Sequence, residues 1–364
     1  MASSPSVVVG TLIGPPRVQV MTEVSAVSPP TSDLRDPLDE ARDVLERLFQ
    51  RVSARVLGRD EVIELVLVAL VADGHVLLED FPGSGKTTLA KALGEAMLDD
   101  RPSEERGLVE RFRRIQFTPD LLPSDITGTS IFEPSTGRLR FSPGPVFAHV
   151  VLADEINRTS PKVQAALLEA MAEKQVTVDD GTRALDELFF VVATQNPLDL
   201  AGTYPLPVAQ LDRFLFKIRM EHIDRASELE VLRTLRTRTT PSELPGASRS
   251  EVLRARRVAR ERIHVHELVH EALVDAAQAL RQDRRVLQGI STRALVLAVP
   301  ALQTRALRKG RTWVDATDLE ALLPLVFAHR LELGAGAVSS DEVIRDALAP
   351  ALERLARATL RTGG

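Results

Sequence analysis

Residues Asp80 to Thr88 read DFPGSGKTT, and they lie between a short apolar run and a segment with helical spacing. Gly83 and Gly85 allow backbone N–H groups to turn toward an anion, and the N-terminus of the following helix adds partial positive charge. Lys86 supplies a full charge, and the hydroxyl of Thr87 can bind Mg²⁺. The stretch therefore predicts a phosphate-binding loop between a strand and a helix. The loop residues are Gly83, Ser84, Gly85, Lys86, Thr87 and Thr88.

Five short apolar runs alternate with helical segments in the first 220 residues. Such alternation predicts an α/β fold with a parallel sheet, helices on both faces, and ligands at the carboxyl ends of the strands. The expected strands lie at 74–78, 114–117, 149–153, 188–193 and 215–220. Because the phosphate-binding loop follows the first of these strands, we expect the functional site at that edge of the sheet.

Beyond residue 220 the apolar residues recur at helical spacing. The expected helices cover about 224–238, 248–262, 266–283, 292–308, 315–331 and 340–360. We therefore predict a tail without fixed structure at 1–33, an α/β nucleotide-binding domain at 34–221 and a helical domain at 222–364. Within the α/β domain, the residues at about 120–147 are rich in Gly and Pro and predict a hairpin insert, and 176–184 predict a second hairpin.

The composition excludes several classes of protein. Hydrophobic residues make up 44% of the chain and charged residues 27%, which is ordinary for a soluble globular protein. The net charge of −5 argues against a general nucleic-acid binder, and the absence of cysteine excludes disulfides and thiolate sites. The longest apolar run, 62–72, is shorter than the roughly 20 residues of a membrane span. We therefore expect a cytoplasmic protein that does not insert into membranes.

Polar residues end the third and fourth predicted strands. Asp154 and Glu155 close the third run, at a strand end where a charge faces ligand and solvent. If that strand lies beside the phosphate-binding loop, Asp154 could hold Mg²⁺ while Glu155 orients and deprotonates the attacking water. Asn196 follows the fourth run, where it could bond the γ-phosphate and that water, or serve only as a turn residue before Pro197.

Five strings carry a resemblance to the MoxR family of AAA+ ATPases, over roughly residues 37–332. They are HVLLEDFPGSGKT at 75–87, LADEINR at 152–158, VATQNPLDLAGTYPLP at 192–207, QLDRF at 210–214 and GISTRA at 289–294. The resemblance implies a P-loop αβα core with a five-stranded parallel sheet, followed by an all-helical lid domain. It also implies ATP hydrolysis with Mg²⁺.

The resemblance further assigns roles to two arginines. Arg213 resembles the arginine finger, which reaches the nucleotide of the next subunit and is worth ~10³–10⁵ in rate. Arg293 resembles the sensor-2 arginine, which contacts phosphate from the lid of the same subunit. A finger supplied by a neighbour implies a homo-oligomeric ring, by resemblance a hexamer. The family also implies chaperone-like remodelling or metal insertion, with a partner that contains a von Willebrand factor A domain.

Two other functions stay open. The string HELVH at 266–270 matches the HExxH zinc metalloprotease signature, with His266 and His270 as ligands and Glu267 activating water. The competing interpretation is the start of an amphipathic helix, and no convincing third ligand is nearby. Arginines at 254, 256, 257, 260 and 262 could suit a DNA-translocating AAA+ motor. Because glutamates and no aromatics interleave them, a solvated helix face or a subunit contact is the favoured interpretation.

Overall fold

A computed structural model of the chain describes residues 36–79, 84–102, 109–179, 181–196, 202–234, 244–334 and 339–362. Contacts group Asp36–Gly364 into one unit and Met1–Arg35 into another. The predicted tail at 1–33 lies outside the described residues, as do residues 80–83 of the phosphate-binding loop.

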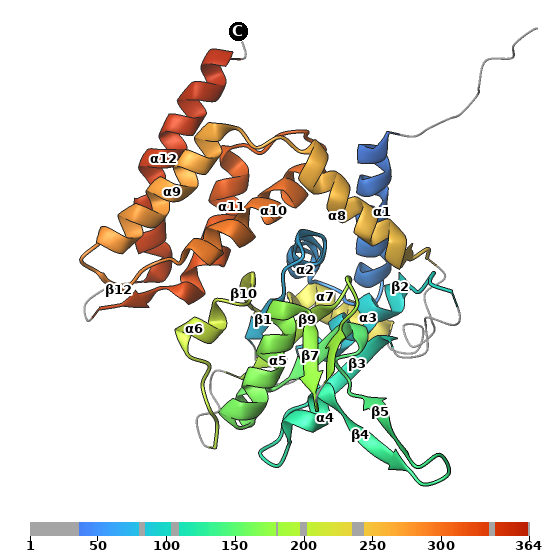
Figure 1. Ribbon diagram of the computed structural model, residues 1–364. Helices are drawn as coiled ribbons and strands as arrows, with labels where there is room; N and C mark the ends of the chain where they lie inside the picture. Colours follow the sequence, from blue (N-terminus) through green and yellow to red (C-terminus); the bar gives the residue numbers. More distant parts are fainter. Residues whose placement is uncertain are drawn as a thin grey trace, which may run out of the picture. The chain divides into compact units, whose positions relative to one another are not determined.

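A five-stranded parallel sheet forms the core of the fold (Figure 1). In space its strands follow the order β10-β1-β9-β6-β3. Their bounds are β1 (Val76–Glu79), β3 (Glu110–Gln116), β6 (Ala148–Asp154), β9 (Phe190–Gln195) and β10 (Phe216–Arg219). All five predicted strands are confirmed, with bounds that differ by a few residues.

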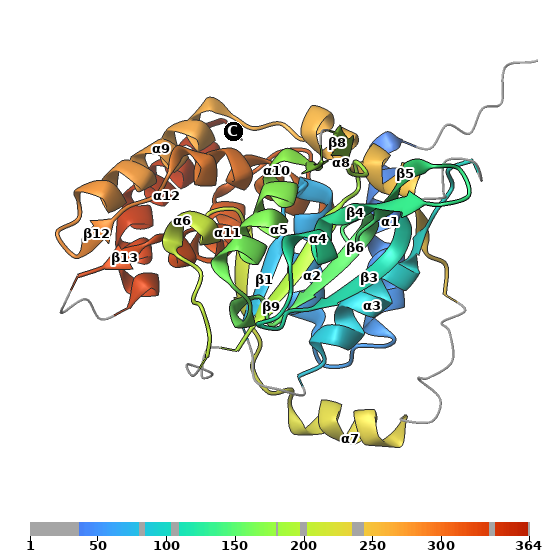
Figure 2. The ribbon, with the colours of Figure 1, turned by 60° about the horizontal axis from the view of Figure 1, so that its bottom comes forward.

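Both faces of the sheet are buried, because successive side chains of a strand point to opposite faces. In β6, Val150 and Leu152 pack into one hydrophobic cluster, whereas Val151 and Ala153 pack into another. The first cluster is covered by α1 (Pro37–Ser53), α2 (Asp60–Ala72) and α3 (Lys86–Ala96), and the second by α4 (Pro123–Thr127) and α5 (Pro161–Glu173). The predicted αβα layering is thus present (Figure 2).

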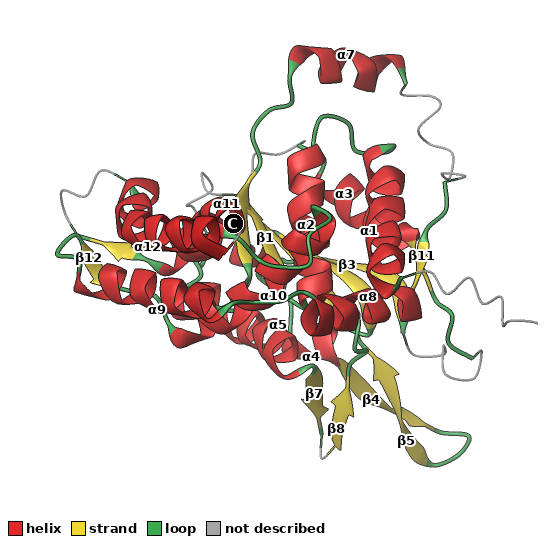
Figure 3. Ribbon diagram, turned by 90° about the horizontal axis from the view of Figure 1, so that it is seen from above, coloured by secondary structure: helices red, strands yellow, loops and turns green. Residues whose placement is uncertain are grey.

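Two short antiparallel hairpins extend from the same side of the core (Figure 3). They are the predicted insert, β4 (Gly128–Glu133) with β5 (Arg138–Pro143), and the predicted second hairpin, β7 (Gln175–Val178) with β8 (Gly181–Ala184). The ring of Phe141 packs edge-on against Phe147 and lies 3.9 Å from the guanidinium carbon of Arg183. These contacts tie the base of the insert to the second hairpin, while Phe132 and Leu139 stay exposed.

The C-terminal part of the chain is helical, as predicted, apart from two small strand pairs. The helices are α7 (Arg225–Arg233), α8 (Arg249–Arg262), α9 (Glu267–Gln282), α10 (Thr292–Arg308), α11 (Ala316–Phe327), the 3₁₀ helix η3 (Ala328–Arg330) and α12 (Ser340–Thr362). The strand pairs are β12 (Val286–Gln288) with β13 (Glu332–Leu333), and β11 (Ala247–Ser248) with β2 (Met97–Leu98) of the core. The first hydrophobic cluster continues from the sheet through α2 into α10 and α11.

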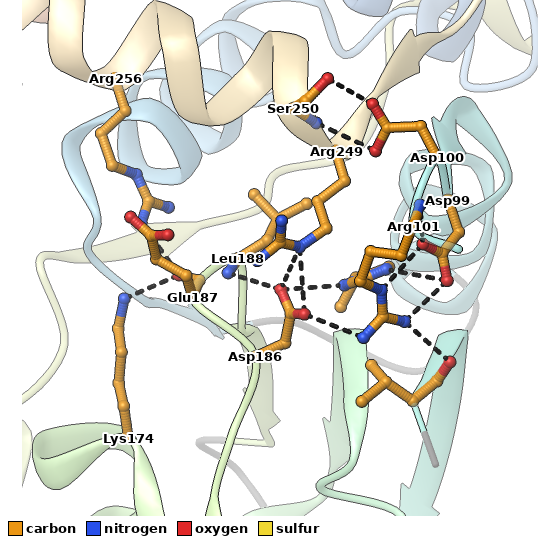
Figure 4. Close-up of polar contacts among 12 residues, drawn as sticks. Asp99, Asp100, Arg101, Lys174, Asp186, Glu187, Leu188, Arg249, Ser250 and Arg256 are labelled. Carbon is orange, nitrogen blue, oxygen red and sulfur yellow. Dashed lines mark hydrogen bonds and ion pairs between the residues drawn. The ribbon is translucent and has the colours of Figure 1, made fainter. Parts of the chain in front are cut away.

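Helix α8 is fastened to the core around Asp186 (Figure 4). Arg249, the first residue of α8, donates through Nε to Asp186 at 2.8 Å, and Arg101 reaches the same carboxylate at 3.2 Å. The fully buried His149 lies 3.4 Å from Asp186 and 3.7 Å from Asp99. Burial alone would raise the pKa of Asp186, but the bonds from His149 and Arg249 hold it well below its usual value. Helix α8 lies beyond residue 221, yet it also packs on α1 and α2 of the core. The domain boundary expected near residue 221 therefore stays a prediction.

The arginine-rich segment of α8 is not a uniformly solvated face. Arg256 is 4% exposed, donates to the backbone carbonyls of Leu70 and Glu187 at 2.9 and 3.0 Å, and pairs with Asp73 at 2.7 Å. Arg260 also reaches Asp73, at 3.6 Å. The interpretation as a solvated face is therefore wrong for Arg256, because its guanidinium instead donates to one carbonyl at the end of α2 and to the carbonyl of Glu187. The same contacts remove Arg256 from any surface that could bind DNA.

Candidate nucleotide-binding site

The phosphate-binding loop leads into α3 as predicted. Gly85 is the N-cap of α3 and has φ 93°, in the left-handed region that glycine adopts readily. A Cβ at Gly85 would meet no atom within 4 Å, so the need for glycine arises from the backbone and not from lack of space. Lys86 begins the helix, and Thr87 and Thr88 follow on its exposed first turn. The N–H groups of such a turn have no intrahelical acceptors and attract anions.

A cavity of about 340 Å³ lies at this first turn. Its walls are formed by Ser84, Gly85, Lys86, Thr87, Thr88, Asp154, Glu155 and Asn196. The structure therefore brings together the predicted loop residues, the two carboxylates and the amide. Gly83 belongs to the same prediction but lies outside the described residues.

Strand β9 lies between β1 and β6 in the sheet. Strand β9 therefore separates the strand of Asp154 from the strand that precedes the loop, although Asp154 still lines the cavity at the loop. The register pairs Leu78 with Thr194, and Ala153 with Ala193, so the three strands end at nearly the same level. Asn196, one residue beyond β9, consequently leaves the sheet between the loop and the carboxylates. From that position an amide can reach groups on either side.

Asp154 is held by two side chains at the end of β6. Its carboxylate is 11% exposed, and it accepts from Thr194 Oγ1 at 2.7 Å and from Arg114 Nη2 at 2.7 Å. The fully buried Thr194 also accepts from the backbone N–H of Glu155, at 2.9 Å. Thr194 thus positions both carboxylate residues. The sequence did not single out Thr194, and its only signal was its place in the run that precedes Asn196.

Glu155 has φ 59° and ψ 49°, a left-handed conformation that is uncommon for a residue with a Cβ. The 3₁₀ helix η2 (Ile156–Arg158) follows directly. The Oε2 atom of Glu155 accepts from Gln116 Nε2 at 2.9 Å and lies 3.3 Å from Arg158 Nε. Such strained backbone conformations cluster at functional sites. Here the conformation accompanies a carboxylate that is held on two sides at the cavity wall.

A second cavity, of about 510 Å³, shares Ser84, Gly85 and Thr88 with the first. Its other lining residues are Arg55, Val56, Leu57, Arg59, His222, Ile223, Glu228, Val231 and Leu232. Five of these side chains are aliphatic, so this cavity offers an apolar surface next to the phosphate-binding loop, as a purine base requires. The sequence did not indicate these residues, because the turn after α1 and the helix α7 carry no motif.

Gly58 allows the two walls of the second cavity to meet. It has φ 69°, and a Cβ added there would lie 2.6 Å from Ser227 Oγ of α7. A side chain at this position would therefore be strained and would push α7 away from the turn that contains Leu57. Gly58 keeps the apolar wall of α7 close to the loop.

Arg213 lies at the opposite edge of the sheet. It follows α6 (Val208–Leu211) and precedes β10, and the N–H of Leu215 donates to the carbonyl of His75, just before β1, at 2.7 Å. Since β1 and β10 run parallel, Arg213 sits beyond the end where they begin, whereas the phosphate-binding loop follows the end of β1. Arg213 is not among the described residues that line either cavity.

Arg293 lies at the start of α10, which contacts the segment that carries Arg213. Ser291, two residues earlier, is the N-cap of α10 and donates through its hydroxyl to the carboxylate of Asp212 at 3.0 Å. Arg293 is exposed on the first turn of α10 and, like Arg213, is not among the described residues that line the two cavities. The segments that carry the two predicted phosphate-sensing arginines thus contact each other, at the edge away from the chain's own site.

The HELVH string does not form a metal centre in the described structure. His266 is the N-cap of α9, and its Nδ1 accepts from the backbone N–H of Leu268 at 3.2 Å. Glu267 and His270 are exposed and lie 3.4 Å from each other. Among the described residues, no three His, Cys, Asp or Glu side chains gather in a way that could hold a metal ion. The string is used to start a helix.

None of the described helices is both long and apolar enough to cross a membrane.

Comparison with known proteins agrees with the fold and the cavity. Residues 75–216 match the model of the ATPase family associated with various cellular activities, and residues 278–349 match an AAA lid domain.

Two curated relatives align with most of the chain. The uncharacterized protein YeaC of Bacillus subtilis is 39% identical over 329 residues, which cover 89% of this chain and 99% of that protein. Chaperone MoxR1 of Mycobacterium tuberculosis is 37% identical over 314 residues, which cover 82% of this chain and 78% of MoxR1.

One solved structure, of a protein of Cytophaga hutchinsonii proposed to be an ATPase, superposes with a TM-score of 0.76 at 34% identity. The match covers 86% of this chain and 96% of that one. The nucleotide-site geometry, the lid and these relatives together show that the chain belongs to the MoxR family of AAA+ ATPases.

Proposed function

We propose that this chain hydrolyses ATP in a homo-oligomeric ring, with each nucleotide held between two copies, and that the lid movement remodels a partner protein. The observation that carries the proposal is the separation of Arg213 from the chain's own nucleotide cavity. The four residues of β1 alone span roughly 10 Å between the two edges of the sheet. A second copy is therefore the natural source of the arginine for each site, and by family resemblance six copies close the ring.

The residues around the first cavity can perform hydrolysis. The N-terminus of α3 and Lys86 would bind the β- and γ-phosphates. Thr87 and Asp154 present oxygen donors to the same cavity, a set that suits Mg²⁺, which when bound would neutralise charge on the phosphates. Glu155, held by Gln116 and Arg158, would orient and deprotonate the attacking water, and Asn196 would bond that water and the γ-phosphate. The second cavity would take the adenine.

Both phosphate-sensing arginines would act on the neighbouring copy. Arg213 would stabilise the charge of the transition state. Arg293 was expected to contact phosphate from its own lid, but Ser291, two residues before it, bonds Asp212, and this supports action of Arg293 in trans, alongside Arg213. One face of each copy would then supply two positive charges to the next copy's nucleotide.

The work done on a partner rests on the family. One relative is named a chaperone, and the MoxR resemblance points to a partner with a von Willebrand factor A domain, matured or loaded with metal. The insert hairpin contributes exposed Phe132 and Leu139, which could contact such a partner. A pull-down from the native organism's lysate with Glu155→Gln protein in ATP would identify it, with Lys86→Ala protein, which should bind ATP much more weakly, as the control.

Assembly provides the test of this proposal. Sedimentation of the Glu155→Gln protein with ATP and Mg²⁺ should give a species several times the monomer mass, and wild-type turnover per subunit should rise with protein concentration. A monomer at every concentration, with constant turnover per subunit, would overturn the ring.

A further inference from the structure

The guanidinium of Arg330 is buried against the segment that carries Arg213. Arg330 ends η3 of the lid and is 2% exposed. Its Nε donates to Asp212 Oδ1 at 2.7 Å, its Nη2 to the carbonyls of Asp212 and Phe214, and its Nη1 to the carbonyls of Leu215 and Val326. The five N–H donors of the fork therefore all have acceptors. Four of these bonds end on residues 212–215, so the backbone is held by Arg330 on both sides of Arg213.

A second lid residue reaches the same carboxylate. The hydroxyl of Ser291 lies 3.0 Å from both oxygens of Asp212 and accepts from the N–H of Ala294 at 3.2 Å. One side chain thus caps α10, which carries Arg293, and bonds the residue that precedes Arg213. His329 adds a contact of 3.0 Å to the carbonyl of Phe214. Two separate parts of the lid, η3 and the start of α10, therefore converge on Asp212–Leu215.

The side chain of Arg213 is held less firmly than its backbone. Its Nε is buried and has no hydrogen-bond partner among the described residues. A shift of the backbone at residues 212–215 would therefore carry this guanidinium with it. That backbone is fixed by the lid, since Phe214 and Leu215 are fully buried and bonded to Arg330.

We propose that Arg330 and Ser291 are positioning residues, through which the lid of one copy aims Arg213 at the nucleotide of the next copy. The inference rests on the proposed action of Arg213 in trans. A rotation of the lid would move η3 and α10 together, and would carry the Asp212 carboxylate and the carbonyls bonded to Arg330 with them. Lid position in one subunit would then control hydrolysis in its neighbour.

Ser291→Ala is the main test variant, because it removes the bond to Asp212 without burying an unpaired charge. It also removes a helix cap, so Ser248→Ala is the matched control. Ser248 caps α8 in the same way, accepting from the N–H of Glu251, but does not contact Asp212. Ser291→Thr keeps both the hydroxyl and the cap and should restore activity. Asp212→Asn provides a second variant that keeps the shape of the carboxylate.

The expected result is a loss of kcat without a loss of ATP affinity. A misplacement of about 1 Å can cost ~10² in rate, so Ser291→Ala should lower kcat by roughly 10- to 100-fold. Ser248→Ala and Ser291→Thr should stay within about twofold of the wild type. Equal kcat values for the Ser291→Ala and Ser248→Ala proteins would overturn the inference.

Mixed rings separate a defective finger from a defective site. Ser291→Ala subunits keep a working nucleotide site of their own. Mixing them with Lys86→Ala subunits, which keep their arginines, should therefore restore turnover. Mixing them with Arg213→Ala subunits should not restore turnover. The reverse pattern would place Ser291 in its own subunit's site and contradict the proposal.

A third mixture, of Arg213→Ala with Lys86→Ala subunits, tests the proposed function itself. If this mixture fails to restore turnover, action in trans is wrong and the inference falls with it. If this mixture restores turnover but the Ser291→Ala mixture does not, the inference alone is wrong.

Discussion

Charged side chains at the two edges of the central sheet differ in how exposed they are and in how fully they are hydrogen-bonded. At the edge where the strands end, Lys86, Thr87, Asp154 and Glu155 line an open cavity, and the threonine hydroxyl is exposed. At the edge where the strands begin, the guanidinium of Arg330 is buried and every N–H donor is used. The first arrangement suits a ligand that comes and goes, whereas the second suits a part that must be held in place. The chain therefore carries a binding surface on one edge of the sheet and a rigid support on the other.

The largest expected effect is on the base at the open edge. Glu155→Gln keeps the shape of the side chain but removes the proton acceptor, so ATP turnover should fall by ~10²–10⁴ while ATP binding persists. Glu169→Gln, on the exposed face of α5, is the matched control. Steady-state turnover and equilibrium binding measured together check the prediction. Turnover near the wild-type value would remove Glu155 from the role of base.

Loss of the loop lysine should act on binding. Lys86→Ala removes a charge-assisted contact to phosphate, so the Kd for ATP should rise by roughly 10- to 100-fold. Lys91→Ala, on the same helix and 3.9 Å from Glu95, should leave the Kd unchanged. Calorimetric titration with ATP checks both variants, and unchanged affinity in Lys86→Ala would refute the loop assignment.

The second cavity allows the proposed nucleotide site at the open edge to be divided into a part for the phosphates and a part for the adenine ring. Leu232 is 69% exposed, so Leu232→Gln should leave the fold intact but make the apolar wall polar without adding charge. ATP affinity should fall roughly fivefold, while affinity for inorganic triphosphate should not change. Leu139→Gln, at a site that is 68% exposed on the insert hairpin, is the control. An equal loss for both ligands would contradict the assignment of this cavity to adenine.

The smallest effect concerns the polar cluster that fastens α8 (Figure 4). Hydrogen bonds from Arg101 lower the pKa of Asp99 to about 2, below the usual value of an aspartate, which is about 3.9. A carboxylate whose pKa is lower in the folded than in the unfolded protein stabilises the fold at pH values above its unfolded-state pKa. That stability is lost as the pH falls through its folded-state pKa. Asp99→Asn should therefore cost about 1 kcal/mol at pH 7, after allowance for solvent screening.

This cost should shrink as the pH falls from about 4 to about 2. Denaturant unfolding at several pH values measures it, with Asp43→Asn, at a carboxylate that is 53% exposed, as the control. A cost that does not change over this pH range would show that the Asp99 carboxylate does not carry the difference.

Much of the fold was readable from the sequence because the relevant signals are local. The seven residues of β6 are all buried, and their apolar run ends in two carboxylates, so both the strand and its functional end could be predicted. Gly85 and Lys86 predict an anion site for the same reason. The backbone conformation of Gly85 and the charge of Lys86 both act within a few residues. These features need no knowledge of which elements become neighbours.

The parts that could not be predicted depend on neighbours. Periodicity does not say that β9 separates β1 from β6, and it does not say that α7 closes a cavity against Leu57. Arg256 and Arg330 looked like ordinary charged residues of helical segments, yet both are buried because carbonyls from distant segments accept their N–H groups. The contact between Asp212 and Ser291, at the start of the helix that carries Arg293, likewise depends on how the lid packs.

The most direct test of the contrast between the two edges is a mixture of two inactive proteins. Arg213→Ala subunits keep a nucleotide site without a finger, and Lys86→Ala subunits keep a finger without a site. In randomly mixed rings at equal amounts, about one interface in four joins a working site to a working finger. We expect ATP turnover of the mixture to rise well above that of either protein alone, toward a quarter of the wild-type value. Turnover no higher than the average of the two separate proteins would show that Arg213 does not act on the neighbouring copy.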